Sequence, residues 1–244
     1  KNITISTTNS IIVGKENNDN LSRNSVSIGL KNTSIRPISS IVGGEENNVT
    51  DASNAIVYGK KNIVNTSKQS IIVGSTNNSN FDNNSGIIGN NNTNNTVQNM
   101  LVVGHDNIST SNISNLTVGK SNNVTNGETS GIFGSDNTEN NSEASMVVGS
   151  SNITNTNVDS IIIGKQNEAE NNKRIGVIGN IIDVSNNTEN SFLVGKKHRE
   201  KTGKQNITGG ESNKIITTIN NITGGSSNEI TDGSANIVQG RRNT

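Results

Sequence analysis

The sequence predicts an all-β fold, a long parallel β-roll, or solenoid, made of about sixteen stacked coils. Three observations predict it: a glycine recurs every fifteen residues, an apolar run precedes each of these glycines, and an asparagine follows most of them. We call these glycines the anchors. They are Gly14, Gly29, Gly44, Gly59, Gly74, Gly89, Gly104, Gly119, Gly134, Gly149, Gly164, Gly179, Gly195, Gly210, Gly225 and Gly240. One residue is inserted between Gly179 and Gly195, and we expect a single domain over residues 1–244.

Each apolar run is predicted to form a β-strand that ends at its anchor. Residues 71–73 (Ile-Ile-Val) and 161–163 (Ile-Ile-Ile) are typical, and β-branched side chains of this kind suit a pleated, packed surface. The anchor can take the positive φ that the end of such a strand requires.

The three residues of the run are mainly apolar, and the middle one is also apolar in most copies. Because side chains alternate across a strand, this pattern predicts that both faces are buried. One face can pack inside its own coil, whereas the other needs a partner. We therefore expect copies of the chain to associate along the length of the solenoid.

An asparagine lies three residues after the anchor in fourteen of the sixteen copies, the exceptions being Ile182 and His198. Asparagine tolerates left-handed backbone geometry and bonds to neighbouring backbone, so it belongs in a corner. Coils stacked at the strand spacing of ~4.8 Å would place these side chains in a ladder. The predicted ladder residues are Asn17, Asn32, Asn47, Asn62, Asn77, Asn92, Asn107, Asn122, Asn137, Asn152 and Asn167.

The rest of each coil is polar and carries one or two apolar residues, which we interpret as the inward side of a second, weaker strand. These residues are Val49, Val64, Phe81, Val97, Val124 and Ile215. Phe133 and Phe192 lie within the apolar runs and are expected in the core.

The composition argues against several classes of function. The formal net charge is zero and no basic stripe is present, so nucleic acid is not an expected partner. No cysteine is available for disulfides or thiolate metal sites, and no apolar run approaches the ~20 residues of a membrane span. His105 and His198 lie six coils apart, too far to share a metal or a proton, and both are predicted to be solvated corner residues. We expect no cofactor and no enzymatic activity.

The repeat resembles the head repeat of trimeric autotransporter adhesins. Residues 24–32 read Asn-Ser-Val-Ser-Ile-Gly-Leu-Lys-Asn, which is similar to that family's Asn-Ser-Val-Ala-Ile-Gly-x-x-Ser, and the similarity covers nearly the whole chain. The family's last serine is mostly asparagine here. The late copies Ile207-Thr208-Gly209-Gly210 and Ile222-Thr223-Gly224-Gly225 lack the bulkier triplet.

This resemblance implies a left-handed β-roll assembled as a homotrimer, displayed on the outer membrane of a Gram-negative bacterium. It also implies binding to a host cell-surface receptor or an extracellular matrix protein. The richness in asparagine, isoleucine and lysine is similar to that of fusobacterial adhesins that bind CEACAM-type receptors. A CEACAM-type host glycoprotein is therefore an expected partner, and the chain, which does not begin with Met, is expected to be an internal part of a longer protein.

Two irregular places in the repeat are candidate receptor contacts. Tyr58 is the only tyrosine, and together with Val57 it could form an amphipathic anchor of the kind enriched in binding hot spots. Arg36 lies in an apolar loop that could extend this contact. The other place follows the inserted residue and comprises Lys197, His198 and Arg199, which could contact an acidic glycan or a receptor. Burial of Tyr58 in the roll and solvation of the basic loop are the alternatives.

Other functions remain possible on the sequence. The chain could be a structural spacer with recognition elsewhere in the protein. Ice binding would need a regular threonine array, but the apolar runs carry threonine only at Thr117, Thr208 and Thr223. Enzymes of the left-handed β-helix type resemble six-residue turns, which the fifteen-residue period does not match.

Overall fold

A computed structural model describes residues 1–185 and 188–243, and the described residues form β-strands and no helix. The chain is a parallel β-solenoid of about sixteen coils, as the sequence predicts. It divides into two compact units, Lys1–Ser121 and Asn122–Thr244. Each unit repeats the same coil, in which a five-residue strand alternates with a three-residue strand.

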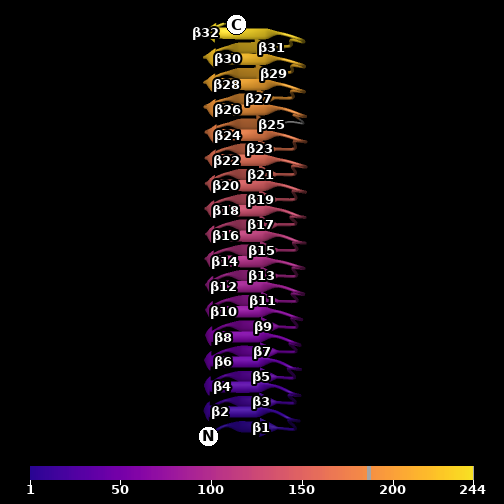
Figure 1. Cartoon of the computed structure of the whole chain (residues 1–244), viewed down its shortest axis with the longest axis vertical. Coiled ribbons are helices and arrows are strands. Elements are labelled where there is room, and N and C mark those ends of the chain that lie inside the picture. Colours follow the sequence, from indigo (N-terminus) through magenta and orange to yellow (C-terminus); the bar gives the residue numbers. More distant parts are fainter. Residues whose placement is uncertain (186–187, 244) are drawn as a thin grey trace. The chain divides into compact units, whose positions relative to one another are not determined.

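In the first unit the short, odd-numbered strands form one parallel sheet and the long, even-numbered strands form another (Figure 1). The odd-numbered strands are β1 (Ile3–Ile5), β3 (Asn18–Asn20), β5 (Thr33–Ile35), β7 (Asn48–Thr50), β9 (Ile63–Asn65), β11 (Asn78–Asn80), β13 (Thr93–Asn95) and β15 (Ile108–Thr110). The even-numbered strands are β2 (Ile11–Lys15), β4 (Val26–Leu30), β6 (Ile41–Glu45), β8 (Ile56–Lys60), β10 (Ile71–Ser75), β12 (Gly86–Asn90), β14 (Leu101–His105) and β16 (Leu116–Lys120).

The second unit has the same two sheets. Its odd-numbered strands are β17 (Asn123–Thr125), β19 (Thr138–Asn140), β21 (Ile153–Asn155), β23 (Glu168–Glu170), β25 (Asp183–Ser185), β27 (Arg199–Lys201), β29 (Lys214–Ile216) and β31 (Glu229–Thr231). Its even-numbered strands are β18 (Gly131–Ser135), β20 (Met146–Ser150), β22 (Ile161–Lys165), β24 (Gly176–Asn180), β26 (Phe192–Lys196), β28 (Ile207–Glu211), β30 (Ile222–Ser226) and β32 (Ile237–Arg241).

The strand register follows the repeat of the sequence. Gly74 pairs with Gly89, fifteen residues later, whereas Gly179 pairs with Gly195, sixteen residues later. The offset changes between Ser185 and Thr188, because Val184 still pairs with Ala169 while the N–H of Thr188 donates to Oδ1 of Asn172. The inserted residue therefore falls at residues 186–187, which lie outside the described residues.

The anchors hold a conformation that only glycine accommodates. Gly164, for example, has φ of +132°, and a Cβ atom on it would overlap the carbonyl oxygen of Gly179 in the next coil. Both the dihedral angle and the close approach exclude a side chain. This explains why the glycine recurs with so little variation.

The interior is lined by the second residue of each long strand and the middle residue of each short strand. Ile72, Ile87 and Val102 of the even-numbered strands are buried, as are Val49 and Val64 of the odd-numbered strands. The apolar contacts do not run without interruption along either unit, since the buried apolar residues fall into separate clusters. Polar inward residues separate these clusters, as described below.

Three aromatic residues are not where the sequence places them. Phe81 follows β11 at a corner with φ of +55°, and its side chain is 62 % exposed rather than inward. Phe192 is the first residue of β26 and Phe133 the third residue of β18, and these positions face outward. The prediction of core positions is wrong for Phe133 and Phe192 because the inward side chain of a long strand comes from its second residue, and for Phe81 because Ser79 of β11 is the inward residue of that coil.

Candidate functional site

The corner asparagines form a buried hydrogen-bonded ladder. Nδ2 of Asn92 donates to Oδ1 of Asn77 (3.1 Å) and to the carbonyl oxygen of Gly104 (2.8 Å). Oδ1 of Asn92 accepts from the N–H and from Nδ2 of Asn107, both at 3.0 Å. Each amide thus joins its coil to the next one and satisfies backbone groups that the corner would otherwise leave buried and unpaired. The ladder is structural, since its side chains have no exposed surface to offer a ligand.

The ladder changes at Ile182 and His198. The N–H of Ile182 still donates to Oδ1 of Asn167, but its own side chain is apolar. His198 is only 1 % exposed, so the prediction of a solvated corner residue is wrong. Its Nε2 bonds to the carbonyl oxygen of Val194 (2.9 Å), and its Nδ1 accepts from the N–H of Asn213 (3.3 Å). A neutral imidazole therefore replaces the amide in donor and acceptor roles, and burial lowers the pKa of His198.

The outward side of the even-numbered strands is a second distinctive surface. Its residues are the first and third of each long strand, and we call it the outer apolar face. Its exposed large apolar members in the first unit are Ile11, Val13, Ile28, Ile41, Ile56, Tyr58, Ile71, Ile88 and Leu101. Those in the second unit are Met146, Ile161, Ile178, Phe192, Val194, Ile207, Ile222 and Ile237. Apolar side chains exposed on neighbouring strands along a whole sheet are typical of contact surfaces.

Aromatic side chains on this face lie over glycines of the neighbouring coil. A Cβ atom on Gly43 would approach Cδ2 of Tyr58 to 2.7 Å, and one on Gly176 would approach Cδ2 of Phe192 to 2.5 Å. The rings therefore occupy the space that a missing side chain leaves. Such rings cover glycine backbone in a sheet and support the strand pairing.

The predicted receptor contacts of the first unit have different surroundings. Tyr58 is 61 % exposed on the outer apolar face. Val57 precedes it in β8, points inward and is fully buried, so its side chain has no surface for a receptor. Arg36 lies at the corner after β5, and its Nε and Nη2 each donate to a carboxylate oxygen of Asp51 at 2.6 Å. This pairing raises the pKa of Arg36 and lowers the pKa of Asp51.

The basic residues of the second unit are also separated by their positions in the coil. Lys197 is exposed at a corner with φ of +55°. His198 is buried in the ladder, so it offers no surface to a ligand. Arg199 begins β27, and its Nε lies 3.5 Å from Oδ2 of Asp183. The three consecutive residues therefore do not form one exposed basic cluster.

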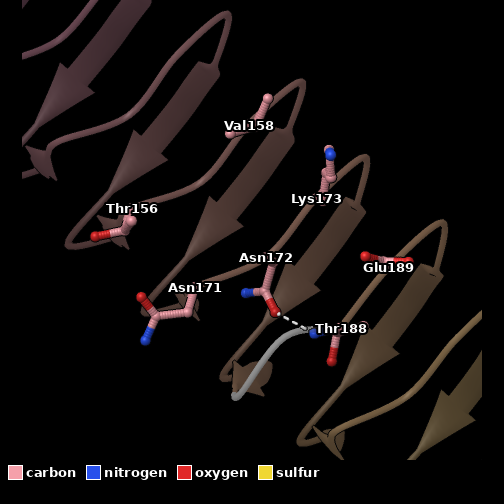
Figure 2. A pocket seen from close by; sticks show the side chains of 7 residues that line it. All are labelled: Thr156, Val158, Asn171, Asn172, Lys173, Thr188 and Glu189. Carbon is pink, nitrogen blue, oxygen red and sulfur yellow. Dashed lines mark hydrogen bonds between the residues drawn. The ribbon is translucent and has the colours of Figure 1, made fainter.

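A shallow pocket of about 250 Å³ lies along the corner that follows the odd-numbered strands (Figure 2). Figure 2 shows Asn172 and Thr188 joined by the hydrogen bond from the Thr188 N–H to the amide oxygen of Asn172. Its lining is Thr156, Val158, Asn171, Asn172, Lys173, Thr188 and Glu189. These groups do not converge on one point, so the pocket lacks the arrangement of an acid–base or nucleophilic site.

Four inward carboxyl groups were missed by the sequence reasoning. They are Asp19, Asp82, Glu139 and Glu200. Their positions in the repeat could have predicted this burial: Glu139, for example, lies fifteen residues after Val124, which is predicted to be inward. Among the described residues, these four included, no group of three or more histidine, cysteine or acidic side chains could hold a metal ion. The described part of the chain also has no helix long and apolar enough to cross a membrane.

Comparison with known proteins adds little. No family model matches the chain, and no curated protein matches it. Among solved structures, a putative acetyltransferase from Desulfovibrio desulfuricans G20 aligns at 6 % identity over 95 % of this chain and 70 % of that chain, with a TM-score of 0.23. The polysialic acid O-acetyltransferase OatWY aligns at 9 % identity over 98 % of this chain and 83 % of that chain, with a TM-score of 0.12. Scores this low carry no inference about fold or activity.

Proposed function

We propose that the chain is the head of a trimeric bacterial surface adhesin. In this proposal three left-handed β-rolls associate on the outer membrane of a Gram-negative bacterium and bind a host cell-surface glycoprotein of the CEACAM type or an extracellular matrix protein. The head acts by binding and catalyses no reaction. The resemblance of residues 24–32 and their fifteen copies to adhesin head repeats supports the class of protein.

The observation that carries the assembly is the outer apolar face. Ile161, for example, is 45 % exposed although it belongs to an apolar triplet in a parallel sheet. Parallel strands with apolar residues on both faces are normally covered on both. Association of copies through this face would bury the outward side of most long strands and remove apolar surface from water.

The assembly is tested with two matched substitutions. Ile161→Lys places a charge on the outer apolar face, whereas Ile153→Lys places one at an equally exposed position (46 %) of the odd-numbered strand β21. Multi-angle light scattering of the full chain should give three copies for the unsubstituted protein and for Ile153→Lys, and a monomer for Ile161→Lys. A monomeric unsubstituted protein would exclude the assembly.

The receptor contact is tested at Tyr58. Since Tyr58 lies on the outer apolar face, a contact between copies and a contact with a receptor compete for it. Tyr58→Ala should weaken binding to receptor-bearing cells while the mass in solution stays unchanged, with only a small loss of thermal stability because the ring no longer covers Gly43. If the trimer dissociates instead, Tyr58 belongs to the assembly and the receptor contact lies elsewhere.

A structural spacer is the second candidate. It is favoured by the ion pairs of Arg36 with Asp51 and of Arg199 with Asp183, because these pairs already occupy two of the predicted receptor contacts. Binding of the isolated chain to epithelial cells separates the two functions. An adhesin head binds, whereas a spacer remains in solution.

A further inference from the structure

The interior of the solenoid contains acidic side chains at regular intervals. Asp19, Asp82, Glu139 and Glu200 belong to the coils of Gly14, Gly74, Gly134 and Gly195, so that one coil in four carries such a group. Each side chain is at most 1 % exposed. Ionised carboxylates are rarely buried in this way without a cation, because burial disfavours the charged form.

Asp82 of the first unit is surrounded by neutral groups. Oδ2 accepts from the Ser79 hydroxyl (2.5 Å), and Oδ1 accepts from the N–H of Val97 (3.2 Å). The residue in the same place of the preceding coil is Ser67, which is buried. Lys68, the nearest charged residue of that coil in sequence, is exposed. Burial raises the pKa of Asp82 to about 6 despite the two hydrogen bonds.

Glu139 of the second unit is more isolated. Val124 and Thr154 are its strand neighbours on β17 and β21, and Ile132 of β18 also points inward. Neither carboxylate oxygen has a hydrogen bond of normal geometry. Burial raises the pKa of Glu139 to about 7, and the Ser130 hydroxyl offsets only part of this effect.

No charge faces Glu139 from the elements around it. The other charged residues of its own coil and the adjoining corners are Glu128, Asp136 and Glu143, which are exposed. The strands β17, β18, β19 and β21 contribute no lysine, arginine or histidine. Since these strands hold no cationic side chain, the charge of Glu139 can be neutralised there only by binding a proton.

We propose that Asp82 and Glu139 are proton-binding sites inside the solenoid, and that the coils around them loosen as the solution changes from mildly acidic to mildly alkaline. This inference concerns the coil itself and is independent of the adhesin proposal.

The direction of the change in stability with pH follows from the pKa of each carboxyl group in the folded and in the unfolded chain. A carboxyl whose pKa is higher in the folded chain than in the unfolded chain binds more protons when folded, so stability falls as the pH rises between the two values. For Glu139 this interval runs from 4.5 to about 7, and for Asp82 from 3.8 to about 6. His198 acts in the opposite direction below its ordinary pKa of 6.5, since burial lowers the pKa. Because His198 is present in every protein compared below, its contribution cancels when their pH profiles are subtracted.

The test compares thermal melting of the full chain at about pH 5 and about pH 8 for four proteins. These are the unsubstituted chain, Asp82→Asn, Glu139→Gln and the control Glu143→Gln, which neutralises an exposed carboxylate of the same coil. From the lower to the higher pH, the unsubstituted chain and the control should lose roughly 5 °C more than Glu139→Gln does. Asp82→Asn should remove a smaller part of the loss. Parallel pH profiles for all four proteins would overturn the proposal.

A direct readout complements the melting curves. The side-chain carboxyl carbon of Glu139, followed by NMR, should titrate with a midpoint near 7. A midpoint at the ordinary value of 4.5 would refute the assignment even if melting depended on pH. Should Glu139→Gln fail to fold, Glu139→Val replaces it, because valine occupies the same position of the coil at Val64 and Val124.

Discussion

The even-numbered and the odd-numbered strands line the same interior within each unit, but their inward side chains differ. The inward second residue of a long strand is apolar in most coils, as with Ile72, Ile132 and Ile162. The middle residue of a short strand can be apolar or fully polar, as with Val64 and Glu139. Hydrophobic burial is therefore concentrated on one wall of the coil.

Some inward polar side chains of the short strands are stabilised by small polar residues at the neighbouring corners. Glu200 shows this most clearly: Oε1 accepts from the Ser191 hydroxyl (2.9 Å) and from Nδ2 of Asn206 (2.7 Å). Gly203 leaves the space that this carboxylate occupies, since a Cβ atom there would overlap it. The difference between the walls teaches that a solenoid can fold with few apolar residues if one sheet supplies most of the hydrophobic burial while the other also admits polar inward side chains.

The largest effect on stability is expected at the anchor glycine near the end of each long strand. Gly164→Ala should destabilise the chain by about 3–5 kcal/mol, because it adds backbone strain at positive φ and a clash with the carbonyl of Gly179. Gly209→Ala is the control, since no atom lies within 4 Å of its Cβ position. Chemical denaturation followed by circular dichroism measures both. If Gly164→Ala lowered the free energy of unfolding as little as Gly209→Ala does, the anchors would need no glycine.

The next prediction compares the two walls directly. Ile162→Ala should cost about 2–5 kcal/mol through lost burial and a cavity. Thr154→Ala, at an equally buried middle position of β21, should cost about 1 kcal/mol, because its hydroxyl makes only one long bond of 3.4 Å. The same denaturation measurement applies. A Thr154→Ala loss as large as that of Ile162→Ala would contradict the division between the walls.

The corner ladder joins the walls and gives a third prediction. Asn152→Ala should cost about 1–3 kcal/mol, since it leaves the carbonyl of Gly164 and the N–H of Asn167 without their bonds. Asn126→Ala removes a bond to Asn141 of similar length at an exposed corner and should change stability by less than about 0.5 kcal/mol. The contrast fails if both substitutions have the same effect.

The smallest effect concerns the ladder position that holds a histidine. Because burial lowers the pKa of His198, the folded chain binds fewer protons than the unfolded chain, and stability should fall as the pH drops below 6.5. Protonation also turns Nδ1 into a donor facing the N–H of Asn213. His198→Asn should remove this acid-side loss in melting curves recorded across the pH range. If the melting temperature of His198→Asn still fell below pH 6.5 as steeply as that of the unsubstituted chain, the loss would not come from His198.

Much of the fold could be predicted because the repeat is periodic. The anchors, the apolar triplets and the corner asparagines each recur at a fixed place in the fifteen-residue repeat. Because the coils stack in register, residues at the same place in the repeat lie above one another. The candidate site was less predictable. Tyr58 and Val57 are neighbours in sequence, yet one is exposed and the other buried, because alternate residues of a strand face opposite sides.

The sequence by itself determined the period, the strands and the corner position of the asparagines, since glycine accommodates positive φ and an asparagine amide bonds to neighbouring backbone. The left-handed conformation itself falls on the residue before the asparagine, such as Lys61, which the sequence did not indicate. Only the tertiary structure decided which side of each strand is inside. It placed Phe81 and Phe192 outside, His198 inside the ladder and the carboxyl of Glu139 in the interior. The physical reason is that inward and outward positions follow from how coils stack, so a charged residue in an inward phase is buried whatever its own preference for water.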